Sequence, residues 1–169
     1  MAPEVVMEDE DVVDLAVAAW RVGDRWSLAA LPERAGESMD VLLGTLRQLV
    51  ADRGAVGFLV AEEDFFLAVR VMPEGSARVL LSDVGAALDW PIAEAAVDLI
   101  GVDLPDDDDA DEVEPVGDVG LLSDLGMPIM EMELILEDPD MYPDEQVAAI
   151  AARLGFGEQL AEFIDSLGG

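Results

Sequence analysis

The chain has 169 residues, of which 52% are hydrophobic, and its 39 acidic residues against eight basic ones give a formal net charge of −31. This composition suffices for one folded domain with a core, and it disfavours direct contact with nucleic acid or with anionic membranes, because both repel a strongly acidic protein. The absence of cysteine, histidine and lysine excludes disulfides, the common zinc sites, histidine-based catalysis and Schiff-base chemistry.

The first twelve residues, MAPEVVMEDEDV, are acidic from the start. A secretory signal needs a basic stretch followed by an unbroken apolar run, and neither is present. No stretch of about 18 uncharged apolar residues occurs, so the sequence predicts no membrane-spanning helix. We therefore expect a cytoplasmic protein that does not bind membranes.

Two strands are predicted next, over residues 15–22 and 25–31, on either side of the dipeptide Gly23-Asp24. A Gly-Asp pair between two apolar runs is typical of a tight β-hairpin. A helix is then expected from Ser38, a good N-cap, to Gly54, a good C-terminal stop. Its apolar residues recur at helical spacing, and they are Met39, Leu42, Leu43, Leu46, Leu49 and Val50.

Three more strands are predicted over residues 55–61, 65–72 and 77–83, and the links between them are short enough for antiparallel hairpins. A second helix follows over residues 90–101, with Pro91 in its first turn, where the missing N–H costs nothing. Strands, a helix and strands again, joined by short links, predict an α+β fold. We expect about five strands in a mostly antiparallel sheet with helices on one face.

Charge divides the chain unevenly. Residues 1–78 contain seven of the eight arginines and 15 acidic residues, whereas residues 79–169 contain one arginine, Arg153, against 24 acidic residues. Short helical patterns recur in the last third of the chain. We expect an α+β sheet domain over residues 12–101, an acidic linker over residues 102–117 and a small C-terminal helical part over residues 118–169.

The stretch LPDDDDADEVEPVGD, residues 104–118, contains eight acidic residues among 15. As a calcium loop of the EF-hand type it has Asp107, Asp109 and Asp111 at positions 1, 3 and 5, but Glu112 stands where the loop needs glycine. A block of like charges usually forms a solvated linker, and it speeds association if it docks on a basic protein. The residues that would contact such a partner are Asp106, Asp107, Asp108, Asp109, Asp111 and Glu112.

No other motif carries chemistry. The sequence has no glycine-rich phosphate loop, and we expect no catalytic residue, no cofactor and no tight metal site. The acidic cluster over residues 137–145 fits a helix end followed by a new helix at Pro143, where carboxylates complement the helix dipole. Met127, Met130 and Met132 fit either a core or an adaptable partner surface.

Two stretches carry a family resemblance: LLSDVGAALDWP, residues 80–91, and MYPDEQVAAIAARLGFG, residues 141–157. With the Gly-Asp hairpin upstream and the acidic break between them, they resemble the actinobacterial tRNA adenosine deaminase-associated protein family over about residues 12–167. The resemblance implies a link to the deaminase that edits tRNA, and it brings no catalytic residues. The chain has none of the His and Cys zinc ligands of such a deaminase, so it is not the deaminase itself.

Two functions from different classes stay open. The first is a non-catalytic accessory protein that binds either the tRNA adenosine deaminase or another basic protein, without contacting nucleic acid. The second is a carboxylate-dependent metal-binding enzyme of unknown substrate. We expect the first, because an acidic protein is complementary to the basic face that a tRNA-binding enzyme needs. The sequence predicts no oligomeric state.

Overall fold

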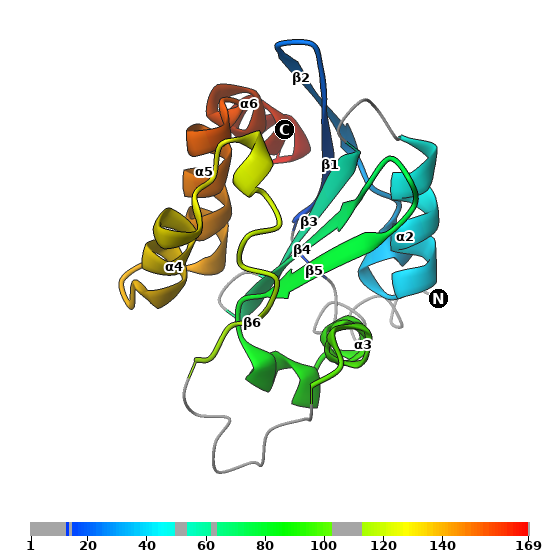
Figure 1. Ribbon diagram of the computed structural model, residues 1–169, viewed down its shortest axis with the longest axis vertical. Coiled ribbons are helices and arrows are strands. Elements are labelled where there is room, and N and C mark those ends of the chain that lie inside the picture. Colours follow the sequence, from blue (N-terminus) through cyan, green and yellow to red (C-terminus); the bar gives the residue numbers. More distant parts are fainter. Residues whose placement is uncertain (1–12, 14, 50–53, 62–63, 103–112, 169) are drawn as a thin grey trace.

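The computed structural model describes residues 13, 15–49, 54–61, 64–102 and 113–168. They form one six-stranded antiparallel sheet with α-helices on both of its faces (Figure 1). The α+β class is confirmed, but the sheet has six strands instead of about five, and helices cover both of its faces instead of one. The strand order is β2-β1-β3-β4-β5-β6. The strands are β1 (Leu15–Val22), β2 (Arg25–Ala30), β3 (Ala55–Ala61), β4 (Phe65–Val71), β5 (Ala77–Leu81) and β6 (Val116–Gly117).

The predicted hairpin joins β1 and β2. Gly23 has a φ of 63°, a left-handed conformation that glycine adopts without strain. The resulting two-residue turn places Arg21 opposite Trp26. β2 is an edge strand, and β1 pairs on its other side with β3, so β2 and β3 run in the same direction on either side of β1.

Helices α2 (Met39–Gln48) and α3 (Pro91–Ile100) cover one side of the sheet, which we call the first face (Figure 1). The Ser38 hydroxyl accepts a hydrogen bond from the Val41 N–H at 3.3 Å, so the predicted N-cap is confirmed. Gly57 on β3 leaves room for α2, since a Cβ there would lie 3.2 Å from a methyl group of Leu42. Leu42 and Leu46 of α2 are fully buried against this face.

Helices α4 (Ile129–Glu137), α5 (Pro143–Leu154) and α6 (Gly157–Gly168) lie on the opposite side, the second face (Figure 1). Phe58 and Phe66 of the sheet pack there with Ile150 of α5. The Trp26 indole N–H donates to the Leu154 carbonyl at 3.1 Å, and the Trp26 ring centroid lies 4.7 Å from that of Phe156. These contacts join the N-terminal hairpin to the last two helices.

Every residue of β3 and β4 is buried. This follows from their sequences, AVGFLVA and FFLAVRV, in which apolar residues do not alternate with polar ones, because both faces of the sheet are covered. None of the helices in the described part of the chain is both long and apolar enough to cross a membrane.

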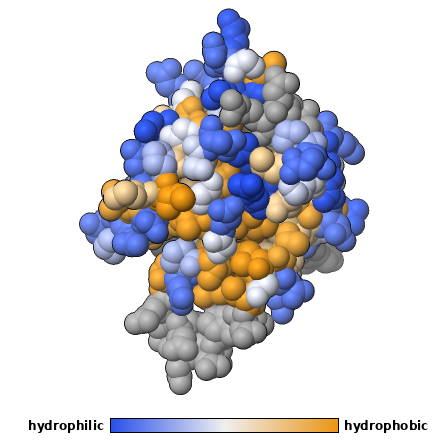
Figure 2. Space-filling view, in the orientation of Figure 1, coloured by the Kyte–Doolittle hydropathy of each residue, from blue (hydrophilic) through white to orange (hydrophobic). Residues whose placement is uncertain are grey.

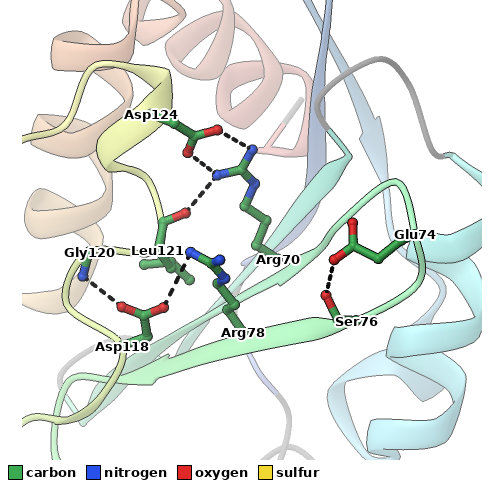
Figure 3. A network of polar contacts seen from close by, with 8 residues as sticks. All are labelled: Arg70, Glu74, Ser76, Arg78, Asp118, Gly120, Leu121 and Asp124. Atoms are coloured by element: carbon green, nitrogen blue, oxygen red, sulfur yellow. Dashed lines mark hydrogen bonds and ion pairs between the residues drawn. The ribbon is translucent and has the colours of Figure 1, made fainter.

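Two arginines stand opposite each other on neighbouring strands of the second face. Arg70 on β4 is directly paired with Arg78 on β5, an arrangement of like charges that destabilises a sheet by itself. Arg70 is 1% exposed. Its guanidinium donates to the Leu121 carbonyl at 2.8 Å and forms a two-pronged ion pair with Asp124, while Arg78 lies 3.8 Å from Asp118 (Figure 3). The segment 118–124 therefore supplies the countercharge to both arginines.

Removal of the Asp124 carboxylate should destabilise the fold. Asp124→Ala removes the half-exposed carboxylate that pairs with the buried Arg70 guanidinium, and we expect the free energy of unfolding to fall by about 2 kcal/mol. Urea unfolding of the purified variant measures this loss.

The double variant Arg70→Met/Asp124→Ala separates the charge effect from lost packing. It should lose less stability than Asp124→Ala alone, because no buried charge is left uncompensated. An Asp124→Ala variant within about 0.5 kcal/mol of the unchanged protein would mean that the ion pair contributes little.

Candidate partner-binding surface

Helix α4 presents apolar side chains in two opposite directions. Met132 and Leu136 are buried in the core of the second face. Met130 and Leu134, one turn apart, are 76% and 70% exposed. A surface helix ordinarily turns polar residues outward, so an exposed apolar row marks a place where another molecule can bind. We call Met130 and Leu134, with the exposed Glu133 and Glu137, the α4 surface.

Figure 2 shows the distribution of apolar and hydrophilic side chains on the face of the molecule that includes α4. Apolar side chains gather at the left-hand edge, where α4 lies, and again in the lower centre, near β6 and α3, with hydrophilic side chains between them (Figure 2). Single exposed apolar residues are normal on a protein surface, whereas neighbouring ones rimmed by charge are typical of interaction sites.

Several polar contacts hold α4 in position. The Gln146 side-chain amide on α5 donates to the Ile135 carbonyl at 2.8 Å, and Arg153 on α5 forms an ion pair with Glu131. Before α4, Gly126 adopts a left-handed φ of 117° and turns the chain into the helix. The exposed residues are therefore carried by a fixed element, which reduces the entropy lost when a partner binds.

The acidic cluster after α4 has the structural role expected from the sequence. The Asp138 carboxylate accepts from the Asp140 N–H at 2.9 Å in the turn. Helix α5 begins at Pro143, and the Glu145 carboxylate accepts from the Tyr142 N–H at 2.9 Å. The prediction of a helix end, a turn and a new helix start is confirmed.

The three clustered methionines divide between the two roles considered for them. Met127 and Met132 are 1% and 0% exposed and belong to the core, whereas Met130 is on the surface. The sequence showed the density of methionines but not which of them points outward.

A groove runs between β6 and α4. Its volume is about 210 Å³. The buried Leu80 and Leu136 lie beneath it, and the exposed Glu133 and Glu137 line it from successive turns of α4. The remaining lining residues are Pro115, Val116, Gly117 and Val119.

The six acidic residues predicted to contact a partner, Asp106, Asp107, Asp108, Asp109, Asp111 and Glu112, lie outside the described residues. Their role therefore stays a prediction. Among the described residues, no group of three or more Asp, Glu, His or Cys side chains is placed to hold a metal ion.

Comparison with known proteins places the chain in a family. The model of the family described as Rv3753c-like tRNA adenosine deaminase-associated protein matches residues 14–157, a span from the start of the sheet through α5. The chain belongs to this family. It is 40% identical to Protein Rv3753c of Mycobacterium tuberculosis (strain ATCC 25618 / H37Rv) over 154 residues, which cover 90% of this chain and 88% of the relative. No solved structure matches.

Two features position β6, the strand that forms one wall of the groove. Gly117 on β6 has a φ of 113°, and a Cβ there would lie 2.2 Å from the Val79 carbonyl oxygen, so only glycine fits beside β5. Upstream, the Asp83 carboxylate accepts from the Gly85 N–H at 3.0 Å and from the Glu114 N–H at 3.4 Å. Asp83 thereby ties the chain entering β6 to the segment after β5.

Partial burial raises the pKa of Asp83 above its ordinary value of 3.8, and the hydrogen bonds from the Gly85 and Glu114 N–H groups oppose that rise. Between 3.8 and the higher folded value, the folded chain binds more protons at Asp83 than the unfolded chain does. The contribution of this carboxyl to stability therefore falls as the pH rises through that window.

The variant Asp83→Asn should remove this pH dependence. The asparagine carbonyl can accept the same two hydrogen bonds but does not ionise, so the stability of the variant relative to the unchanged protein should rise as the pH increases from below 3.8 through the higher folded pKa of Asp83. Thermal unfolding across this range measures the difference. Asp89→Asn, which removes an exposed carboxylate from the same segment, controls for the change in net charge. Equal profiles for the two variants would refute the assignment to Asp83.

Proposed function

We propose that this protein is a non-catalytic accessory protein that binds another protein through the α4 surface, and that the partner is the tRNA adenosine deaminase. One observation carries the binding role: Met130 and Leu134 are exposed side by side on a helix that is otherwise anchored in the core. The description of the family, tRNA adenosine deaminase-associated, supports the choice of partner.

Charge supports the same partner class. A tRNA-binding enzyme needs a basic face for the phosphate backbone, and this chain carries a formal net charge of −31. Apolar side chains at the centre of an interface supply most of the affinity, while surrounding charges raise the association rate and select the partner. The α4 surface combines both, with Met130 and Leu134 beside Glu133 and Glu137.

Such binding gives the protein a regulatory role. If it covers the RNA-binding face of the deaminase, it competes with tRNA and acts as a brake or a holding partner. The alternative considered from the sequence, a carboxylate-dependent metal-binding enzyme, has no specific observation in its favour among the described residues.

The double variant Met130→Ser/Leu134→Ser should weaken binding to the purified deaminase by at least about tenfold. The reason is that serine buries much less apolar surface on binding than methionine or leucine does. Isothermal titration at low salt measures the affinity. The matched control is Val22→Ser/Leu99→Ser, which changes two exposed apolar residues on other elements. The control should bind like the unchanged protein.

Two results would contradict the proposal. If the unchanged protein does not bind the deaminase at low salt, the partnership is wrong. If the control variant loses as much affinity as the α4 variant, the contact does not lie on α4.

The acidic stretch can be tested separately. Replacing Asp106, Asp107, Asp108 and Asp109 with serine should slow association with the deaminase and flatten its dependence on salt, since a run of like charges acts mainly on the encounter rate. Stopped-flow association at several salt concentrations measures both. An unchanged association rate would leave this stretch as a linker only.

A further inference from the structure

We propose that the groove between β6 and α4 receives the side chain of an arginine or lysine from a basic segment of the partner protein. This inference rests on the proposed function, which it deepens by naming the chemistry that the α4 surface recognises.

The shape of the groove suits one long side chain. Its volume of about 210 Å³ is below the range of about 300–1,000 Å³ typical of sites for drug-sized ligands. Its base is apolar, with Leu80 and Leu136 buried beneath it. Arginine and lysine carry an apolar stem with a charged head, and they bury the stem along apolar surface while the head reaches a polar partner.

The two glutamates that line the groove favour a cationic ligand. Glu133 and Glu137 are four residues apart on α4, where like charges destabilise a helix. Glu137 is the last residue of α4, and the last turn of this helix contains no basic residue, so the helix dipole disfavours Glu137 as well. Glu131 on the same helix pairs with Arg153, whereas neither groove carboxylate pairs with a described arginine. A cation from outside would relieve both unfavourable effects.

Other occupants fit less well. A second copy of this chain would bring another formal charge of −31, and the two acidic surfaces would repel each other. The chain's own longest undescribed segments, residues 1–12 and 103–112, contain five and seven acidic residues and no basic one. Nucleic acid would bring phosphates to the carboxylates. A basic protein segment is the occupant whose charge is complementary.

A peptide titration tests the groove without the deaminase. The probe is acetyl-Leu-Arg-Leu-amide, and its control is the same peptide with citrulline, which keeps the shape of arginine but lacks the charge. In NMR spectra of the ¹⁵N-labelled protein, the arginine peptide should shift the amide signals of Val116, Gly117, Glu133 and Glu137 most strongly. The citrulline peptide should shift them at least about threefold less. Shifts spread over the whole acidic surface, or equal shifts with both peptides, would overturn the inference.

A pair of variants tests the carboxylates directly. Glu133→Gln/Glu137→Gln should weaken binding of the arginine peptide and of the deaminase by at least about fivefold. The matched control, Glu158→Gln/Glu162→Gln, removes two exposed carboxylates with the same spacing on α6 and should change both affinities by less than about twofold.

The results also separate this inference from the proposed function. If Glu133→Gln/Glu137→Gln and its control both bind the deaminase as tightly as the unchanged protein does, the groove is not a recognition site. The partnership with the deaminase would still stand. If the arginine peptide binds in the groove but the deaminase does not bind the protein, the groove is a site for a cationic side chain and the deaminase is not the partner.

Discussion

Arg70 holds a guanidinium group on the second face of the sheet, at a position that is 1% exposed. Because arginine stays protonated in proteins and a buried charge is costly unless it is paired, the fold must bring a carboxylate to this position. Asp124 provides it, and the Leu121 carbonyl accepts a further hydrogen bond from the same group. This pairing, together with the burial of Leu121 and Leu122, holds the segment 118–124 against the sheet. Since the segment leads directly into α4, the candidate surface is positioned by the same interaction.

The uneven distribution of charge along the sequence is partly explained by ion pairs within the fold. Two arginines of the first half, Arg70 and Arg78, pair with aspartates of the second half, Asp124 and Asp118. These contacts join the two halves of the chain electrostatically, yet they engage only a few of the 24 acidic residues after position 78. The excess of carboxylates is far larger than internal pairing requires. It is therefore available for solubility and for the attraction of a basic partner.

Much of the fold could be predicted from local signals. The Gly23-Asp24 hairpin, the Ser38 N-cap and the helix start at Pro143 each depend on residues close together in the sequence, and each is confirmed. β6 was not predicted because two residues, Val116 and Gly117, are too short for an alternating pattern. Its pairing with β5 depends on a left-handed glycine, which does not stand out in a sequence with 15 glycines.

The sequence also indicates where the C-terminal helices lie. The unbroken apolar runs of β3 and β4 indicate strands buried on both faces, and the helices after residue 128 are the elements that cover the second one. The α4 surface was harder to find. Apolar residues occur all around α4, so no stripe indicates which side faces outward. Only the packing of Met132 and Leu136 against the core shows that Met130 and Leu134 are left exposed.

The hydrogen bond between Trp26 and Leu154 joins residues 128 positions apart, and this separation bears on the protein's synthesis. β5 ends at Leu81 and α5 begins at Pro143, so 61 residues, 82 to 142, must be translated between them. At about 5–20 residues per second, the ribosome needs roughly 3–12 seconds for this stretch. During that interval Phe58 and Phe66 lack the side chains of α5 that pack with them in the finished fold. The nascent chain thus passes through a stage in which one side of its sheet is open to chaperones and to neighbouring nascent chains, and this stage lasts until α5 has been translated.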